Sequence, residues 1–344
     1  STLLASSAAS DVYKRQIDGL VNFNLDEVSP TIIKVIGVGG GGGNAVEYMY
    51  SKGICDVDFV VCNTDAQTLE NSPVPLKIQL GKKLTEGHGA GNDPFQGARS
   101  AEESLEEIKE MLRRNTKMAF ITAAMGGGTG TGAAPVIARL TKEMDILTVG
   151  IVSIPARFEG PKRLNQAREG LRLLKDNVDC LIVIDNEKIK KIYGSQTISA
   201  AFAKANDVLN IAAKGIAEII TLPGYINVDF ADVKTVMTNS GVAIMGAAQA
   251  SGEDRAKRAI TEALDSPLLN NNDIRGAKDI LLNITSGTNE VTMNEMTEIT
   301  SIIIHRVGDT AAVIWGVGTD ESLGDAISVL SLIHISEPTR PEPI

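Results

Sequence analysis

Short apolar runs alternate with longer amphipathic segments along the first half of the chain. The runs are rich in β-branched residues, have the length of strands, and cover residues 32–38, 58–62, 76–80, 118–123, 148–154 and 180–184. Between them, apolar residues recur every three or four positions, as in Leu105, Ile108 and Leu112, which predicts helices. Continuous apolar strands that alternate with helices are typical of parallel sheets covered on both faces. The pattern therefore predicts an α/β fold built on a Rossmann-like parallel sheet.

The pattern changes after a long helical segment. Over residues 200–222, apolar side chains recur at alternate threes and fours, which predicts a central, buried helix that Pro223 and Gly224 end. Beyond it, the sequence predicts strands over 241–250, 280–284 and 312–317 and a helix over 293–305, as in a smaller α+β domain. The predicted organisation is an α/β domain over 17–199, a central helix over 200–222 and a C-terminal α+β domain over 223–329.

One stretch between a predicted strand and a predicted helix is dominated by glycine. Five of the seven residues from Gly126 to Gly132 are glycines, separated by Thr129 and Thr131, and Pro135 opens the helical pattern that follows. Glycine runs are costly to order, but they let backbone N–H groups approach phosphate oxygens at the start of a helix. The stretch predicts a phosphate cradle, with the two threonine hydroxyls as further donors.

A second glycine run follows the first predicted strand. Residues 39–43 are all glycine and Asn44 comes next, which predicts another phosphate-type turn. Gly37, Gly39 and Gly42 also satisfy the G-x-G-x-x-G dinucleotide pattern, in which Asp65 would bind a ribose hydroxyl. A nicotinamide-dependent oxidoreductase is therefore an alternative, although that class does not require the second glycine stretch. The P-loop signature G-x-x-x-x-G-K-[ST] is absent from the sequence.

Polar residues at three places are further site candidates, and two of these three sets have a second interpretation. Glu159 and Arg163 follow a buried strand, where α/β folds place ligand residues, but their spacing also suits an ion pair along a helix. Asn186 follows the next strand and could contact the edge of a base. Asp229 and Asp232 fall on one side of a helical turn, although Asp229 would also serve as an N-cap.

Composition narrows the ligand and partner classes. The chain has 344 residues and a formal net charge of −10, which argues against a nucleic-acid groove or an anionic membrane surface. The three cysteines and three histidines lack metal-ligand spacing, so no metal-binding residue is predicted, and scattered cysteines are typical of a reducing compartment. We expect neither a membrane span nor a signal peptide, because the apolar runs are short and no basic leader is present.

The two ends of the sequence are related through their codons. Residues 11–16 can be encoded by GAT GTG TAT AAG AGA CAG, whose reverse complement encodes Leu-Ser-Leu-Ile-His-Ile, the sequence of residues 330–335. This inverted match resembles a sequencing adapter translated at both ends. We therefore expect residues 1–16 and 330–344 to be foreign and to lie outside the fold.

The glycine stretches and a later motif together resemble a known family. The string Gly-Gly-Gly-Thr-Gly-Thr-Gly at 126–132, with Asn-Val-Asp-Phe-Ala-Asp-Val at 227–233, resembles the FtsZ family of bacterial cell-division GTPases in the tubulin superfamily. The resemblance extends over about residues 32–329. It implies a tubulin/FtsZ-like fold and a GTP-hydrolysing protein that polymerises head to tail in the division ring. A non-hydrolysing paralogue is the runner-up within this group.

The resemblance also implies roles for individual residues. Those implied to contact GTP or GDP are Gly40, Gly41, Gly42, Gly43, Asn44, Gly126, Gly127, Gly128, Thr129, Gly130, Thr131, Gly132, Glu159, Arg163, Asn186 and Asp207, the last two at the guanine. Asn227, Asp229 and Asp232 resemble the synergy loop, which completes the active site of the next subunit by polarising the attacking water. Mg²⁺ is implied at the phosphates, without a protein ligand that we can name.

Partners and localisation are implied in the same way. The resemblance predicts self-assembly, a cytoplasmic location at the midcell ring, no nucleic acid and no direct membrane insertion. Family members bind membrane anchors and regulators through a C-terminal tail, which the foreign residues would replace here. We therefore expect no tail-mediated binding and a frayed edge in the second domain.

Overall fold

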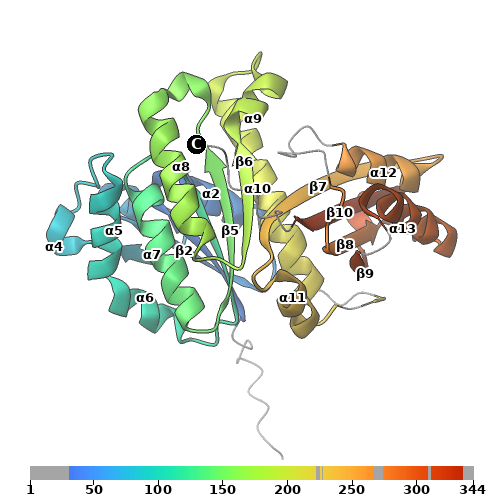
Figure 1. Ribbon diagram of the computed structural model, residues 1–344, viewed down its shortest axis with the longest axis horizontal. Coiled ribbons are helices and arrows are strands. Elements are labelled where there is room, and N and C mark those ends of the chain that lie inside the picture. Colours follow the sequence, from blue (N-terminus) through green and yellow to red (C-terminus); the bar gives the residue numbers. More distant parts are fainter. Residues whose placement is uncertain (1–30, 222–224, 227, 266–273, 309–310, 336–344) are drawn as a thin grey trace, which may run out of the picture. The chain divides into compact units, whose positions relative to one another are not determined.

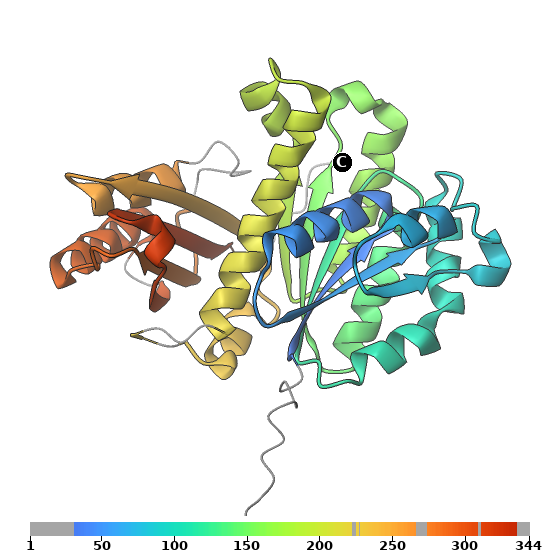
Figure 2. The same cartoon turned by 180° about the vertical axis from the view of Figure 1, so that it is seen from behind.

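The computed structural model describes residues 31–221, 225, 226, 228–265, 274–308 and 311–335. The N-terminal segment predicted to be foreign and Asn227 lie outside the described residues. The described part forms one compact unit from Thr31 onward, built around a ten-stranded sheet with the order β3-β2-β1-β4-β5-β6-β7-β10-β8-β9 (Figures 1 and 2).

The element bounds follow the predicted alternation. The strands are β1 (Ile33–Val38), β2 (Val57–Asn63), β3 (Leu76–Gln79), β4 (Met118–Ala124), β5 (Leu147–Ile154), β6 (Cys180–Asp185), β7 (Gly241–Ser251), β8 (Asp279–Ser286), β9 (Ala312–Thr319) and β10 (Ala326–Ile335). The α-helices are α2 (Gly39–Lys52), α3 (Ala66–Asn71), α4 (Lys82–Thr85), α5 (Pro94–Glu103), α6 (Leu105–Leu112), α7 (Thr129–Glu143), α8 (Pro161–Lys175), α9 (Asn186–Tyr193), α10 (Ile198–Thr221), α11 (Phe230–Met237), α12 (Arg255–Leu264) and α13 (Met293–Val307), with short 3₁₀ turns η1 (Arg157–Glu159) and η2 (Glu321–Leu323).

The first six strands are parallel, and all except the edge strand β3 are largely buried on both faces. Ile33 and Val35 of β1 pack into a core shared with α2 and α10, whereas Ile36 and Val38 pack into a second core shared with α5 to α8. Successive side chains of a strand point to opposite faces, so a continuous apolar run satisfies both cores. The predicted parallel sheet with helices on both faces is confirmed.

The C-terminal half continues the same sheet. β7 pairs with β6 in parallel over a few residues, and then the sheet becomes mixed, with β10 antiparallel to both of its neighbours. α12 and α13 cover one face of this part through a third core. α10 runs beside the sheet, and none of the described helices, α10 included, is long and apolar enough to cross a bilayer.

The expectation that residues after Val329 lie outside the fold is wrong for the first of them. Leu330 to Ile335 form the second half of β10, which lies between β7 and β8 and leaves no frayed edge there. Leu330 and Leu332 pack into the core shared with α10, and Ile333 packs into the core under α12 and α13. The alternating apolar residues suit a strand whatever their genetic origin, and the foreign origin stays a prediction.

Candidate functional site

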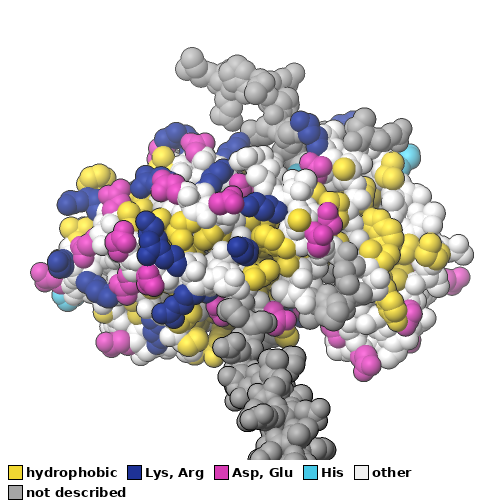
Figure 3. Space-filling model, turned by 90° about the horizontal axis from the view of Figure 1, so that it is seen from below, with side chains coloured by type: hydrophobic (Ala, Val, Ile, Leu, Met, Phe, Trp, Pro, Cys, Tyr) yellow, Lys and Arg dark blue, Asp and Glu magenta, His cyan; other side chains and the backbone are white. Residues whose placement is uncertain are grey.

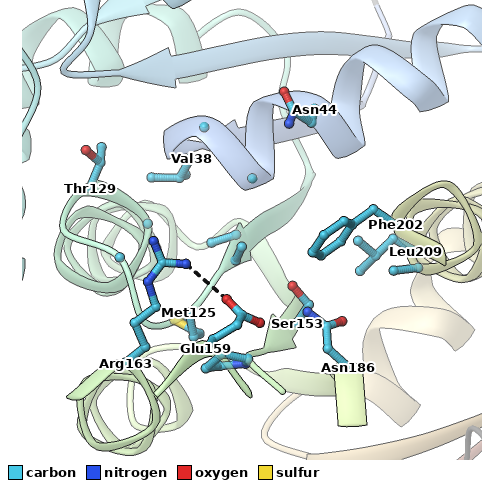
Figure 4. Close-up of a pocket in the computed structure, with 18 of the residues that line it drawn as sticks. Val38, Asn44, Met125, Thr129, Ser153, Glu159, Arg163, Asn186, Phe202 and Leu209 are labelled. Carbon is cyan, nitrogen blue, oxygen red and sulfur yellow. Dashed lines mark hydrogen bonds and ion pairs between the residues drawn. The ribbon is translucent and has the colours of Figure 1, made fainter. Parts of the chain in front are cut away.

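A cavity of about 410 Å³ opens at the carboxyl ends of β1, β4, β5 and β6 (Figure 4). β1 and β4 are neighbours at the point where the strand order reverses, which is where open α/β sheets bind ligands. The lining residues are Val38, Gly40, Gly41, Asn44, Ala123, Ala124, Met125, Gly127, Gly128, Thr129, Gly130, Ser153, Pro155, Glu159, Arg163, Asn186, Phe202, Ala205, Asn206 and Leu209.

The sequence predicted a turn at the first glycine run, but in the structure this run is the start of helix α2. A Cβ on Gly41 would lie 2.3 Å from the Cβ of Ala124, and one on Gly42 would lie 2.3 Å from the carbonyl oxygen of Thr122, both on β4. A Cβ on Gly40 or Gly43 would meet nothing within 4 Å. The glycines therefore let α2 lie directly against β4, and this close packing outweighs their low helix propensity.

The second glycine stretch also enters a helix earlier than predicted. α7 begins at Thr129, so Pro135 lies inside the helix, where its missing N–H leaves the carbonyl of Thr131 without its helical donor. A Cβ on Gly39 would lie 2.8 Å from the backbone nitrogen of Gly130. The beginnings of α2 and α7 are thus in direct contact, and only glycine fits between them.

The two helix starts make one side of the cavity a donor surface for anions. The N-cap residues of α2 and α7 are Val38 and Gly128, neither of which has a side-chain acceptor. The first turns of both helices, which lie wholly within the described chain, contain no acidic residue. Each helix N-terminus carries roughly half a positive charge and unpaired N–H groups, so two of them together favour a polyphosphate.

The two threonines of the second stretch have different roles. Thr129 lines the cavity, and its Oγ1 lies 2.7 Å from Oγ1 of Thr64 at the end of β2. Thr131 is buried, and its Oγ1 accepts a hydrogen bond from the backbone N–H of Gly126 at 2.8 Å. Thr131 does not line the cavity, its hydroxyl oxygen holds the glycine turn together, and its role as a phosphate donor stays a prediction.

Glu159 and Arg163 form the ion pair that one interpretation predicted, and because both line the cavity the ligand-binding interpretation stays a prediction. Both line the cavity, and Nη1 of Arg163 donates to Oε2 of Glu159 at 3.0 Å (Figure 4). Oε1 of Glu159 accepts from the backbone N–H of Ala156 at 3.0 Å, which fixes the carboxylate at the start of α8. The pair places a cation beside the helix starts and an acceptor next to it.

The other side of the cavity combines an apolar surface with amides. Figure 4 places Phe202 and Leu209 of α10 across the cavity from Thr129 and Arg163, with Asn186 near them. Oδ1 of Asn186 is buried without a hydrogen-bond partner among the described residues, so a ligand that donates there would satisfy it. Sequence reasoning missed Phe202 and Asn206, because both lie in a helix whose apolar period indicated only burial.

Several predicted site residues lie beside the cavity and do not line it. This holds for Gly42, Gly43, Gly126, Thr131, Gly132 and Asp207. Oδ1 of Asp207 accepts from the hydroxyl of Tyr48 at 3.1 Å, while its neighbour Asn206 lines the cavity. Asp65, the residue expected at a ribose in the oxidoreductase alternative, instead caps α3 by accepting from the N–H of Thr68.

Asp229 and Asp232 lie near the amino ends of the parallel strands, whereas the cavity lies at their carboxyl ends. Asp229 is the N-cap of α11, and its Oδ1 accepts from the N–H of Asp232 at 2.8 Å. α11 is tied to the turn before β5, where Nζ of Lys234 lies 3.1 Å from Oδ2 of Asp145 (Figure 1). Strand β5 is about 20 Å long, and its carboxyl end lines the cavity. The exposed carboxylates of Asp229 and Asp232 therefore lie far from the cavity of their own chain.

Comparison with known proteins decides the family. Residues 32–194 match the family described as "Tubulin/FtsZ family, GTPase domain", and residues 241–334 match "FtsZ family, C-terminal domain". The chain belongs to the FtsZ family. The second match reaches through most of β10, in agreement with its place in the sheet.

Relatives and solved structures extend the FtsZ match over most of the chain. The cell division protein FtsZ of Porphyromonas gingivalis is 48% identical over 317 residues, which cover 92% of this chain and 69% of that protein. FtsZ of Pseudomonas aeruginosa is 48% identical over 307 residues, with 89% and 77% covered. An empty FtsZ dimer of M. jannaschii has a TM-score of 0.83 and 41% identity, covering 94% of this chain and 91% of that one. The predicted fold and GTPase class are confirmed, and the oxidoreductase alternative is wrong.

The cavity of this FtsZ-family chain fits a guanine nucleotide. Its volume lies within the roughly 300–1,000 Å³ of small-ligand sites. Helix N-termini and Arg163 suit the phosphates, and the unpaired oxygen of Asn186 suits the N–H edge of a base that stacks near Phe202. Among the described residues no group of three or more His, Cys, Asp or Glu side chains is arranged to hold a metal ion.

Proposed function

We propose that this FtsZ-family chain hydrolyses GTP at the contact between successive subunits of a head-to-tail filament. The observation that carries the proposal is the separation of the nucleotide cavity from Asp229 and Asp232, at opposite ends of the parallel strands. A contact that joins unlike ends of two subunits is heterologous, and it generates an open filament when the rotation between subunits does not close a ring. Each contact then brings one subunit's carboxylates to the other's nucleotide.

The nucleotide is held by the chain that owns the cavity. The phosphates lie against the starts of α2 and α7, within reach of Gly40, Gly128 and Thr129, and Arg163 adds a cation. The guanine lies between Phe202 and Asn186, with Asp207 one residue beyond the lining. The two helix starts are rigid, so their donors are in place before GTP arrives and need no rearrangement when it binds.

The reacting water is supplied with a base by the neighbouring subunit. Asp232, with Asp229 in the same turn, orients the water and accepts its proton while the oxygen attacks the γ-phosphorus and the bond to the bridging oxygen breaks. Asn227, two positions before Asp229 in the sequence, completes the proposed set. Asp229 already accepts the N–H of Asp232, so it also fixes the turn that carries the base. Mg²⁺, held mainly by the phosphates, would neutralise the charge that develops on them.

The cellular setting follows from the family. We place the filament in the cytoplasm at the midcell division ring, where membrane anchors and regulators bind the full-length protein. The face that carries α11 has apolar side chains between interspersed acidic and basic ones (Figure 3), and Tyr225 and Ile226 are exposed on the segment before α11. Such a mixed surface suits contact with a second copy better than contact with nucleic acid.

The test measures light scattering and phosphate release after GTP and Mg²⁺ are added. We expect the wild type to assemble and release phosphate, and Asp232→Ala to bind GTP and assemble but to lose turnover. Asp254→Asn is the matched control, because Asp254 is an exposed acid in the left-handed region, which asparagine tolerates. Unchanged turnover in Asp232→Ala would refute the role given to this carboxylate.

Mixed subunits test whether the site is shared. Gly40→Asp has room for its side chain and places a negative charge where the phosphates would lie, so it blocks the cavity without disturbing packing. We expect Gly40→Asp and Asp232→Ala to be inactive alone and to recover turnover when mixed. Absence of recovery, with both variants shown to enter filaments, would contradict catalysis between subunits.

A further inference from the structure

The segment that leads into α11 is joined to the C-terminal half of the sheet. The N–H of Tyr225 donates to the carbonyl of Val317 on β9 at 2.9 Å, and the N–H of Val317 donates to the carbonyl of Ile226 at 3.2 Å. Val228, the next described residue, is buried against the core of α10 and α11. The approach to Asp229 is therefore built as a short antiparallel pairing with β9.

A side-chain bond reinforces this pairing from a third element. The hydroxyl of Tyr225 donates to Oε1 of Glu290 at 2.8 Å, and Glu290 lies in the loop between β8 and α13. The Glu290 carboxylate accordingly raises the pKa of Tyr225. Tyr225 is 70% exposed, so burial of its ring does little to fix its position. The bond to Glu290 is the contact that orients the side chain.

The loop that carries Glu290 is itself fixed by one buried arginine. Nε and Nη2 of Arg255 donate to the Glu295 carboxylate at 2.7 and 3.2 Å, and Nη2 also donates to the carbonyl of Glu290 at 2.9 Å. Nη1 donates to the carbonyls of Asn289 and Asp325, both at 2.9 Å. All five N–H donors of the guanidinium are used, so the backbone at Glu290 has little freedom to move.

The far end of the same segment is fixed to the N-terminal half. α11 buries Val233 and Met237 in the core shared with α10, and Lys234 pairs with Asp145 before β5. Asp229 and Asp232 thus lie between an anchor on β9 and an anchor at β5. The Tyr225–Glu290 bond acts on the first of these anchors, four residues before Asp229.

We propose that Tyr225 and Glu290 are positioning residues, which set the place of Asp229 and Asp232 against the nucleotide of the next subunit. The inference rests on the proposed function, since it assigns the means by which that shared site is aligned. A displacement of about 1 Å at a reacting group can cost two orders of magnitude in rate, whereas a single exposed hydrogen bond contributes little to folding. The bond therefore matters to turnover more than to stability.

Kinetics of four variants test the proposal. Tyr225→Phe and Glu290→Ala each remove the bond, and we expect kcat for phosphate release to fall about three- to tenfold, with KM for GTP and Tm unchanged. The double variant should lose no more than either single one, because both remove the same bond. Glu290→Gln keeps a side-chain oxygen acceptor and should recover most of the rate. Tyr50→Phe, which removes a partly exposed hydroxyl at the end of α2, is the matched control.

Hydrogen exchange gives a readout that does not depend on turnover. Faster exchange of the amides of residues 226–233 in Tyr225→Phe and Glu290→Ala, with the core of β1 unchanged, supports the proposal together with the lower kcat. Wild-type exchange in these variants, or faster exchange with wild-type kcat, overturns it. If the wild type itself releases no phosphate on assembly, the proposed function fails and this role fails with it, which is a different result from an active wild type and equally active variants.

Discussion

His334 makes the stability of this fold depend on pH. It lies on β10 opposite Ala243 of β7 and Asp279 of β8, is buried, and neither ring nitrogen has a hydrogen-bond partner among the described residues. Burial lowers the pKa of the imidazole from its ordinary 6.5 to about 4. The folded chain therefore holds the neutral ring, while the unfolded chain binds a proton as the pH falls below 6.5.

The sign and the size of the effect follow from these two values. The unfolded state binds more protons between pH 6.5 and pH 4, so the free energy of unfolding falls as the pH is lowered through this window. A pKa difference of one corresponds to about 1.4 kcal/mol, so the complete loss is about 3 kcal/mol, of which about 2 kcal/mol has occurred at pH 5. The contribution of His334 to the pH dependence fades as the pH rises from 6.5 to about 7.5.

Urea unfolding of the nucleotide-free chain at pH 7, 6 and 5 measures the effect. His334→Leu removes the ionisable ring and keeps an apolar side chain on the face that already holds Leu330 and Leu332. We expect the variant to be more stable than the wild type at pH 7, by roughly 1–3 kcal/mol, because two unpaired nitrogens are removed. Its advantage should grow by about 2 kcal/mol at pH 5.

His334→Gln separates charge from polarity, since glutamine is polar and does not titrate in this range. It should share the unpaired-group cost of the wild type and, like His334→Leu, lack the loss of stability that protonation of the imidazole causes between pH 6.5 and pH 4. Parallel profiles for the wild type and His334→Leu would refute the reasoning. That result would mean that the protonated ring pairs with Asp279, its neighbour in register on β8.

Three further substitutions have defined outcomes. Arg255→Met should lower the free energy of unfolding by about 3–5 kcal/mol in urea, because it leaves the carboxylate of Glu295 and three carbonyls without their donors, and Arg255→Lys should not restore it. Gly41→Ala should lose nucleotide binding or unfold, whereas Gly40→Ala should be tolerated, as filter binding and circular dichroism would show. Thr131→Val keeps the buried methyl beside Gly170 and removes only the acceptor for Gly126, so it should cost about 1 kcal/mol in thermal unfolding, and wild-type stability of this variant would contradict the bond to the glycine turn.

The sequence predicted every described strand except β10, and it predicted the long helices α7, α10 and α13, because burial repeats locally along a chain. It also indicated that the glycine stretches border a ligand site, since five glycines in seven residues are costly to order without such a role. It did not predict that these stretches enter helices, because helix propensity disfavours glycine and the contact of Gly41 with Ala124 joins residues far apart in sequence. Helix propensity, which depends only on neighbouring residues in the sequence, contains no information on a contact between distant residues.

The sequence also did not predict which side of α10 lines the cavity or that the residues after Val329 form a strand. The side of α10 that lines the cavity is set by where the helix lies on the sheet, and the apolar period that predicts the helix is the same at Phe202 as elsewhere. Residues after Val329 were judged by their codons, although a strand depends only on alternation and partners, both of which Leu330 and Leu332 have.

The cavity and the carboxylates of Asp229 and Asp232 lie at opposite ends of the strands, and this fixes how many complete sites a filament can contain. In a filament built through these ends, a complete site exists only between neighbours, so there is always one site fewer than there are subunits. The terminal subunit whose cavity faces solvent retains its GTP, and the subunit at the other end presents carboxylates with nothing to act on. The two ends are therefore chemically different, and turnover per subunit rises with filament length even when every subunit is identical.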